Sequence, residues 1–340
     1  MKFRTYLCAV GLLSITFVKA STAFLLPDPT THKNWNLVNH DNCGIQNNHI
    51  EQRQLLISFV RDANIGEHPW VVSVYIQNPA VGDVINHTNC MGAIITDRHV
   101  LSASSCFNKF GSQKIPYRSV RVRVGELDKG TNPDCSSDNH CAPKYKEYEI
   151  AKVTYHSGNG YAEDGMNIAL LTTDRQMGVQ QLCGADLFGA RGSDGNPTIG
   201  GQLGIKLSGW GKNTDSGVEE KKLRQARVLG VTEEENTQVF NQLRGSFLRR
   251  ANRESSFCVG QTGGESRHDT DIGGPFMMER AVGSDRARMY LVGILSFSTD
   301  RVNLPQHGVP DVYVKVKFFW PWILDQIDPD LLPTDLPHTS

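Results

Sequence analysis

The chain reads CMGAII at residues 90–95 and, after a short turn, VLSASSC at residues 100–106. The first stretch is a short apolar run, and similar runs recur along the chain, split by Gly, Pro, Asn and Asp. Many short strands with frequent turns predict an all-β sandwich or a pair of barrels. We expect strands at Val71 to Ile76, Gly92 to Ile95, Val120 to Val124, Asn167 to Leu171, Leu203 to Ser208, Tyr290 to Phe297 and Val312 to Val316.

Two stretches have helical features. Glu233 to Arg250 has mixed periodicity, and Phe319 to Ile327 is amphipathic, with Pro321 placed where a first helical turn tolerates it. Residues 24–56 are polar with few strand signals and predict an extended N-terminal segment. The proline-rich tail at 329–340 has little to bury, and we expect it to be flexible.

The composition is that of an ordinary globular protein. Of 340 residues, 39% are hydrophobic and 21% charged, and the net charge is −1. A balance so close to neutral gives no overall attraction to nucleic acid or to acidic membranes. No H-E-x-x-H or C-x-x-C spacing occurs, so we expect neither a metal site nor a cofactor.

The N-terminus has the pattern of a signal peptide over residues 1–23. Lys2 and Arg4 precede an apolar run from Tyr6 to Val18, and cleavage after Ala20 or Ala23 fits the small-residue rule. The run is too short to span a bilayer, and no later stretch approaches about 20 apolar residues. We therefore expect a secreted, extracellular protein without a membrane anchor.

Cysteines are expected to pair in that oxidising compartment. There are eight, and Cys8 leaves with the signal peptide. Seven is an odd number, so at least one cysteine has no partner within the chain.

A series of motifs, in order along the chain, resembles the chymotrypsin/trypsin family. CMGAII and VLSASSC are similar to C-G-G-S-L-I and V-L-T-A-A-H-C, which surround the catalytic histidine of that family. The resemblance implies two packed antiparallel six-stranded β-barrels with a C-terminal α-helix, over residues 57–328. The further matches are GEHPW at 66–70 to G-E-F-P-W, NIALL at 167–171 to D-I-A-L-L, GWG at 209–211, DIGGP at 271–275 to D-S-G-G-P, and GVPDVY at 308–313 to G-V-P-G-V-Y.

The details resemble the arthropod clip-domain proteases and their inactive homologs most closely. Cys135 and Cys141, followed by Ala142-Pro143, look like a small disulfide loop of that branch. The segment before Cys43 is too short and too poor in cysteine to hold a clip domain. Either the clip domain has been lost or the chain is a clip-less relative.

The three catalytic positions of the family carry other residues here. Ser105 stands at the imidazole position, Asn167 at the carboxylate position and Ile272 at the nucleophile position. A serine hydroxyl is no base at neutral pH, an amide cannot stabilise an imidazolium by charge, and isoleucine has no nucleophilic atom. The resemblance therefore implies a pseudoenzyme, with no catalytic residues.

The specificity pocket and the activation site differ as well. Ser266 falls at the pocket floor, and Ser298, next to Phe297, replaces a pocket glycine. Asp311 replaces another glycine and either plugs the cavity or supplies a negative charge for a basic ligand. Leu56 precedes Ile57 where active relatives are cut after a basic residue.

The resemblance also implies three disulfides. Cys90 would pair with Cys106, Cys135 with Cys141, and Cys43 with Cys183, which would tether segment 24–56 to the rest. The usual partner position of Cys258 lies near Asn236, so Cys258 is either a buried free thiol or the site of an intermolecular disulfide.

Two surface features complete the pattern. Asn86-His87-Thr88 is a glycosylation sequon, and a basic run holds Arg244, Arg249, Arg250 and Arg253. The run is either a solvated face or a site for heparin-like or other anionic glycans. By resemblance, the chain acts as a cofactor, scaffold or decoy in an extracellular proteolytic cascade of arthropod immunity or melanisation, with proteases or zymogens as partners. The alternative is a glycan- or pathogen-surface-binding module that uses the arginine run.

Overall fold

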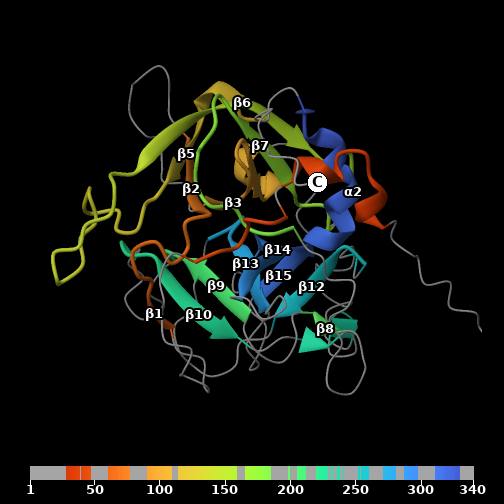
Figure 1. The fold of residues 1–340 in the computed structure, drawn as a ribbon. Helices are drawn as coiled ribbons and strands as arrows, with labels where there is room; N and C mark the ends of the chain where they lie inside the picture. The colour runs from red at the N-terminus through yellow and green to blue at the C-terminus, as the bar shows by residue number, and fades with distance from the viewer. Residues whose placement is uncertain are drawn as a thin grey trace, which may run out of the picture.

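A computed structural model gives the architecture (Figure 1). It describes residues 28–38, 40–46, 60–76, 90–108, 114–158, 165–184, 198–199, 205–211, 220–228, 231–232, 236–237, 240, 252, 254–259, 271–280, 287–297 and 311–329.

The first half of the chain forms a closed barrel with the strand order β2-β3-β4-β7-β6-β5. β5 alternates between buried and partly exposed residues because one of its faces turns toward the barrel interior, whereas β3, β4 and β7 are buried along their whole length. The bounds are β2 (Val71–Ile76), β3 (Cys90–Thr96), β4 (His99–Ser102), β5 (Val120–Val124), β6 (Lys146–Tyr155) and β7 (Ala169–Thr173).

The second half forms a seven-stranded antiparallel sheet in the order β1-β10-β9-β13-β14-β15-β12. It lies below the barrel in Figure 1. The strand bounds are β1 (Val60–Asp62), β9 (Ile205–Gly209), β10 (Arg224–Val228), β12 (Ser256–Val259), β13 (Pro275–Arg280), β14 (Arg288–Phe297) and β15 (Asp311–Lys315), with a separate pair of β8 (Thr198–Ile199) and β11 (Val231–Thr232).

The predicted fold class is confirmed: strands predominate in the described residues, which form a closed six-stranded barrel, a second sheet and a C-terminal helix. The second sheet has seven described strands because short β1 pairs along the outer edge of β10. The strands predicted at Val71 to Ile76 and Val120 to Val124 match β2 and β5 residue for residue, and the other five overlap β3, β7, β9, β14 and β15.

The C-terminal helix α2 (Val316–Gln326) begins three residues earlier than predicted, so Pro321 lies inside it instead of in the first turn. Its buried residues are Val316, Phe319, Trp320, Ile323 and Leu324, which recur with helical spacing. Burial of this stripe, at about 1.5–3 kcal/mol per large side chain, outweighs the roughly 3 kcal/mol that an interior proline costs.

The N-terminal segment contains two short 3-10 turns, η1 (Pro29–Thr31) and η2 (Trp35–Leu37), and its described part has no strand. Asn34 Nδ2 donates to the carbonyls of Leu324 (2.9 Å) and Ile327 (3.2 Å) at the end of α2. A disulfide between Cys43 and Cys183 ties the segment to the stretch after β7, where Cys183 forms a bridge with Tyr290 of β14. Two further 3-10 turns, η3 (Ser104–Phe107) and η4 (Tyr117–Ser119), lie within the barrel half.

Candidate active site

Ser105 lies in η3, directly after strand β4. The neighbouring Cys106 is joined by a disulfide to Cys90 at the start of β3. The Cys106 N–H donates to the carbonyl of Ala103 at 3.2 Å, which closes the turn. Disulfide and turn together fix the backbone of Ser105 against the barrel wall.

Asn167 lies two residues before β7 and is 1% exposed. Its Oδ1 accepts from Ser104 Oγ and from the Ser105 N–H, both at 2.8 Å. Its Nδ2 donates to Ser105 Oγ at 3.1 Å and to the carbonyl and the Oγ of Ser296, both at 3.0 Å. The carboxamide is thus held on both sides by neutral groups from two separate segments, η3 and β14.

Ile272 occupies a turn that joins the two halves of the molecule. Its carbonyl accepts from the Met91 N–H at 2.8 Å, and it forms a bridge with Cys90. The next residue, Gly273, has φ +88°, and a Cβ there would lie 2.2 Å from the Met91 carbonyl. Only glycine fits at position 273. This demand comes from the backbone and does not depend on the side chain of residue 272, so the Gly-Gly-Pro run is present although an isoleucine precedes it.

The structure therefore brings Ser105, Asn167 and Ile272 to one place, around β3, β4 and the Cys90–Cys106 disulfide. Next to Ile272, Asp271 is buried, and its Oδ2 accepts from the Gly211 N–H at 2.7 Å. The groups that surround Asn167 are hydroxyls and backbone amides or carbonyls. Such groups orient one another but exchange no proton at neutral pH.

Ser104 and Ser296 were not anticipated from the sequence as members of this site. Ser104 could have been suspected, since it precedes Ser105. Ser296 lies where the pairing of β14 with β15 changes register between Leu295 and Phe297. Such an irregularity re-aims a side chain, so the alternation of a regular strand could not have placed Ser296 against Asn167.

Of the four predicted pocket residues, two are described. Phe297 is partly buried and packs against Phe240, Cys258 and Val312. Asp311 starts β15 opposite Val259. Ser266 and Ser298 lie outside the described residues, as do Asn86, the four arginines of the basic run, residues 1–27, Leu56 and Ile57.

The disulfides join the three pairs that the resemblance implies: Cys43–Cys183, Cys90–Cys106 and Cys135–Cys141. Cys258 is a free, buried cysteine. Burial, together with the nearby Asp311 carboxylate, raises the pKa of its thiol to about 12.

Two kinds of feature are absent from the part of the chain that the structure describes. No helix in it is long and apolar enough to cross a membrane. Within the same residues, no group of three His, Cys, Asp or Glu side chains could hold a metal ion.

A closed barrel and a second sheet joined at the Ile272 turn, with Ser105 and Asn167 in contact beside the Cys90–Cys106 disulfide, are the arrangement of a trypsin-like serine protease domain. The family model named Trypsin matches residues 57–323, and the chain belongs to this family.

The relatives are proteases of arthropods. The chain is 28% identical to CLIP domain-containing serine protease B4 of Anopheles gambiae, over 84% of this chain and 72% of that one. It is 29% identical to the proclotting enzyme of Tachypleus tridentatus, over 84% and 68%. The crystal structure of the Drosophila Grass clip serine protease of the Toll pathway matches with a TM-score of 0.61 and 25% identity, over 84% of this chain and 74% of that one.

Proposed function

We propose that this chain is a secreted, non-catalytic member of the trypsin family that acts by binding other extracellular proteins as a cofactor, scaffold or decoy in a proteolytic cascade. The observation that carries the proposal is the Asn167 network. The carboxamide is bonded on both sides by serines and backbone, where the family chemistry needs an imidazole held by a carboxylate.

The size of the chemical defect supports the proposal. In this family a hydroxyl attacks, an imidazole takes its proton and a carboxylate stabilises the resulting cation. Ser105, Asn167 and Ile272 supply none of these three functions. Loss of the whole unit costs roughly 10⁶-fold in rate in a trypsin-like mechanism. Hydrolysis at that level would make no contribution to a cascade.

What the chain retains supports a role in association. The barrel, the sheet and three disulfides are all present in the described part of the chain, and they form a rigid scaffold. Loops on a rigid scaffold are the usual site of recognition. Relatives with the names melanization protease 1 and phenoloxidase-activating factor 3 suggest the kind of cascade in which the partners are found.

A serine-directed fluorophosphonate probe tests the absence of catalysis. The purified protein should remain unlabelled, and peptide esters should stay intact, while an active trypsin-family protease treated in parallel is labelled. Stoichiometric labelling of this chain would overturn the proposal.

Depletion tests the role in association. Removing the protein from the extracellular fluid in which it occurs should change the proteolytic processing of other zymogens there, and adding it back should restore that processing. If every processing step proceeds at its normal rate without the protein, the role in a cascade is wrong.

A further inference from the structure

Between β5 and β6 the chain runs for roughly 20 residues, from Gly125 to Tyr145, without forming a strand of more than a single bridge. We call this segment the finger. It extends away from the barrel at the left of Figure 1. Connections longer than about 12–15 residues without secondary structure are uncommon in a compact domain and are usually functional.

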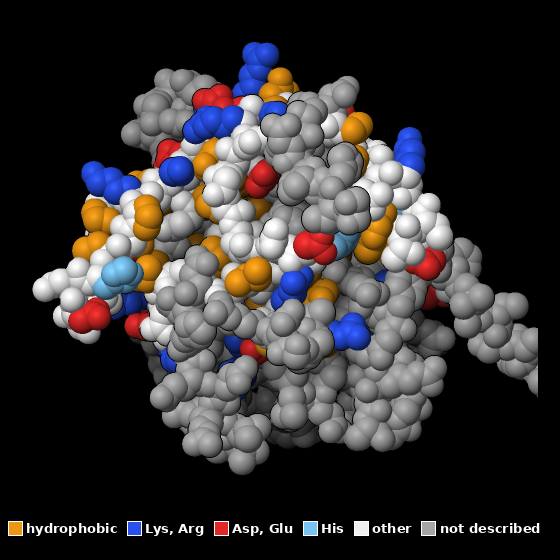
Figure 2. All heavy atoms as spheres, in the orientation of Figure 1, with side chains coloured by type: hydrophobic (Ala, Val, Ile, Leu, Met, Phe, Trp, Pro, Cys, Tyr) orange, Lys and Arg blue, Asp and Glu red, His pale blue; other side chains and the backbone are white. Residues whose placement is uncertain are grey.

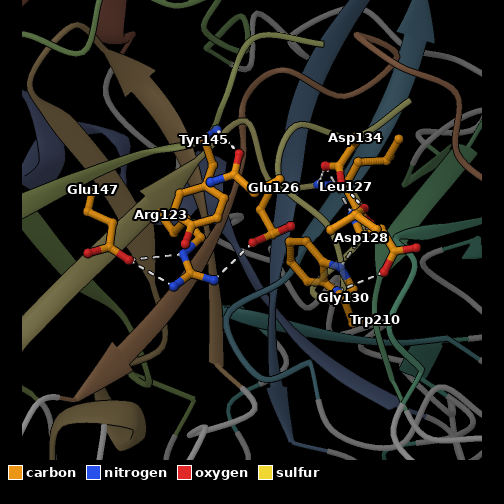
Figure 3. Close-up of polar contacts among 11 residues, drawn as sticks. Arg123, Glu126, Leu127, Asp128, Gly130, Asp134, Tyr145, Glu147 and Trp210 are labelled. Carbon is orange, nitrogen blue, oxygen red and sulfur yellow. Dashed lines mark hydrogen bonds and ion pairs between the residues drawn. The ribbon is translucent and has the colours of Figure 1, made fainter. Parts of the chain in front are cut away.

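Arg123, on β5, braces the base of the finger (Figure 3). Its guanidinium donates to Glu126 Oε2 at 2.9 Å and to Glu147 Oε1 at 2.8 and 3.1 Å. The same group lies 4.0 Å from the centre of the Tyr145 ring. The Glu126 side chain is 1% exposed, so Arg123 neutralises a buried carboxylate at the point where the finger starts.

Asp134 is a second brace, inside the finger. Its Oδ2 accepts from the Leu127 N–H (3.0 Å) and the Asp128 N–H (3.2 Å), and its Oδ1 accepts from Thr131 Oγ1 at 2.6 Å. Asp134 is 5% exposed, while almost every residue around it is exposed. A buried carboxylate with three donors is the hub that fixes the path of the chain.

The finger is also attached to the second sheet. The Lys129 N–H donates to the carbonyl of Lys221 at 2.9 Å, and the Leu223 N–H donates to the carbonyl of Leu127 at 2.7 Å. Leu223 directly precedes β10. The base of the finger is therefore held by both halves of the molecule.

The tip is a closed ring, residues 135–141, sealed by the Cys135–Cys141 disulfide. Inside it the Ser136 N–H donates to the His140 carbonyl at 2.8 Å, and the Asn139 N–H donates to the Ser136 carbonyl at 3.0 Å. Ser136 Oγ also donates to Asp138. All seven residues are exposed, and the tip at the left edge of Figure 2 is mostly uncharged, with acidic and histidine side chains on it.

The ring at the tip, unlike the braces at the base, does little for the chain's own stability, because it buries no apolar surface. Its effect is to order an exposed segment before any partner arrives, and such preorganisation lowers the entropic cost of association. We propose that the finger is a docking element whose tip enters a polar recess on a partner protein, where Asp138 meets a lysine or arginine.

The charge of the tip favours a protein over other macromolecules. Its acidic side chain is the Asp138 carboxylate, and hydrogen bonding from Ser136 lowers the pKa of that group. A negative tip is repelled by sulfated glycans and by anionic lipid headgroups. A basic side chain within a protein recess is the complementary site.

The inference rests on the proposed function in one respect, that the chain acts through a protein partner, and it names the surface. Photo-cross-linking tests it. Ser137, exposed at the tip, is replaced by p-benzoylphenylalanine in the full chain, and the protein is irradiated in the extracellular fluid of its source. Lys33, exposed in the N-terminal segment on the opposite side of Figure 1, carries the same group as the control site.

We expect a protein adduct from the tip site that the control site does not give. Asp138→Lys should lower its yield at least tenfold, while the same charge reversal at exposed Glu254, Glu254→Lys, should leave it unchanged. Opening the ring with Cys135→Ser and Cys141→Ser together should lower the yield severalfold, because the tip is then no longer ordered in advance.

Three outcomes would overturn the inference: no adduct beyond that of the control site, an adduct indifferent to Asp138→Lys, or an adduct only with a second copy of this chain. The two proposals fail separately. If the Asp138→Lys protein restores zymogen processing in depleted fluid as well as the parent does, the docking role of the finger is wrong and the role in a cascade still holds. Labelling by a fluorophosphonate would reject the absence of catalysis and leave the finger untouched.

Discussion

Asn167 donates from its Nδ2 to Ser105 Oγ at 3.1 Å, so an amide and a hydroxyl contact each other at the two positions that the resemblance assigns to the carboxylate and the imidazole of the family. The same Nδ2 also donates to the carbonyl of Ser296 at 3.0 Å. A hydroxyl can rotate to donate or accept, but a carbonyl can only accept. The Ser296 carbonyl therefore decides which residue position 167 tolerates.

Asn167→Asp should destabilise the protein by about 1–3 kcal/mol at pH 7, because a carboxylate oxygen would then face the Ser296 carbonyl without a proton between them. The penalty should shrink at acidic pH, where a protonated carboxyl group can donate. Urea unfolding at pH 7 and pH 4 measures both effects. Asn132→Asp is the matched control, because Asn132 is exposed and its Oδ1 accepts from the Tyr145 N–H, a bond that a carboxylate oxygen can keep. A variant as stable as the parent at pH 7 would contradict the network as described.

The positions of this site could be located from the sequence because they stand beside residues with strict geometric demands. Cys106 fixes Ser105 through its disulfide to Cys90, and Gly273 fixes Ile272 through a backbone conformation that only glycine adopts readily. Ser296 has no such neighbour. Its direction depends on a shift of register between two strands, which is a property of their packing and not of local sequence.

The same contrast holds for the finger and for α2. The Cys135–Cys141 pairing follows from a motif, but the braces at Arg123 and Asp134 join residues that form no recognisable pattern in the sequence. In α2, the local rule for proline placed the helix start too late. The buried stripe from Val316 to Leu324 overrides that rule, because packing against the core outweighs an intrinsic preference.

Arg123→Met should destabilise the protein by about 3–5 kcal/mol at pH 7, because Glu126 would remain buried without its cation. Hydrogen exchange should accelerate most at the finger amides of Leu127 and Asp128. Burial already raises the pKa of Glu126, so the loss should be smaller at pH 4–5, where this carboxyl group is protonated more readily. In the Arg123→Met variant the folded-state pKa of Glu126 would rise further, because the nearby cation is lost.

A double-mutant cycle provides the control for that prediction. Adding Glu126→Gln to Arg123→Met removes the uncompensated charge and should recover part of the lost free energy of unfolding. Arg121→Met is the matched single variant, since Arg121 pairs with Glu149, whose side chain is 64% exposed. It should cost no more than about 1 kcal/mol. Equal losses for Arg121→Met and Arg123→Met would show that the buried pair has no special role.

The stability of the protein should fall at alkaline pH because of the buried thiol of Cys258. Its pKa is about 12 in the folded protein, above the roughly 8.5 of a thiol in an unfolded chain. Between these values the folded state keeps a proton that the unfolded state has released, so stability is fully present below about pH 8.5 and falls as pH rises. The slope is about 1.4 kcal/mol per pH unit.

Urea unfolding between pH 8.5 and 10 isolates this effect, because unfolded tyrosines titrate only near pH 10. Cys258→Ala should flatten the slope in that window, whatever its effect on absolute stability. Thiol titration of the denatured parent should find one free thiol per chain, and none in the native state at pH 8. A denatured monomer without a free thiol would contradict the cysteine pairing, and a covalent dimer without one would indicate an intermolecular disulfide at Cys258.

Restoring the family residues by Ser105→His, Asn167→Asp and Ile272→Ser together should not produce a competent protease. An imidazole at 105 must replace a small hydroxyl beside a buried amide network, and the carboxylate at 167 faces the Ser296 carbonyl. In active relatives the transition-state donors are set when a newly cut N-terminal ammonium pairs with the carboxylate that is Asp271 here. Leu56 before Ile57 offers no basic residue for that cut. Donors held in the wrong place lose about 10²–10³ in rate for each one misplaced.

The triple variant should be assayed against basic and apolar peptide substrates, beside a second variant that adds Leu56→Arg, Ser58→Val, Phe59→Gly and Val60→Gly and is then cleaved with trypsin. Activity that appears only in the cleaved second variant would support this order of defects, whereas turnover by the triple variant alone at the rate of ordinary family members would refute it.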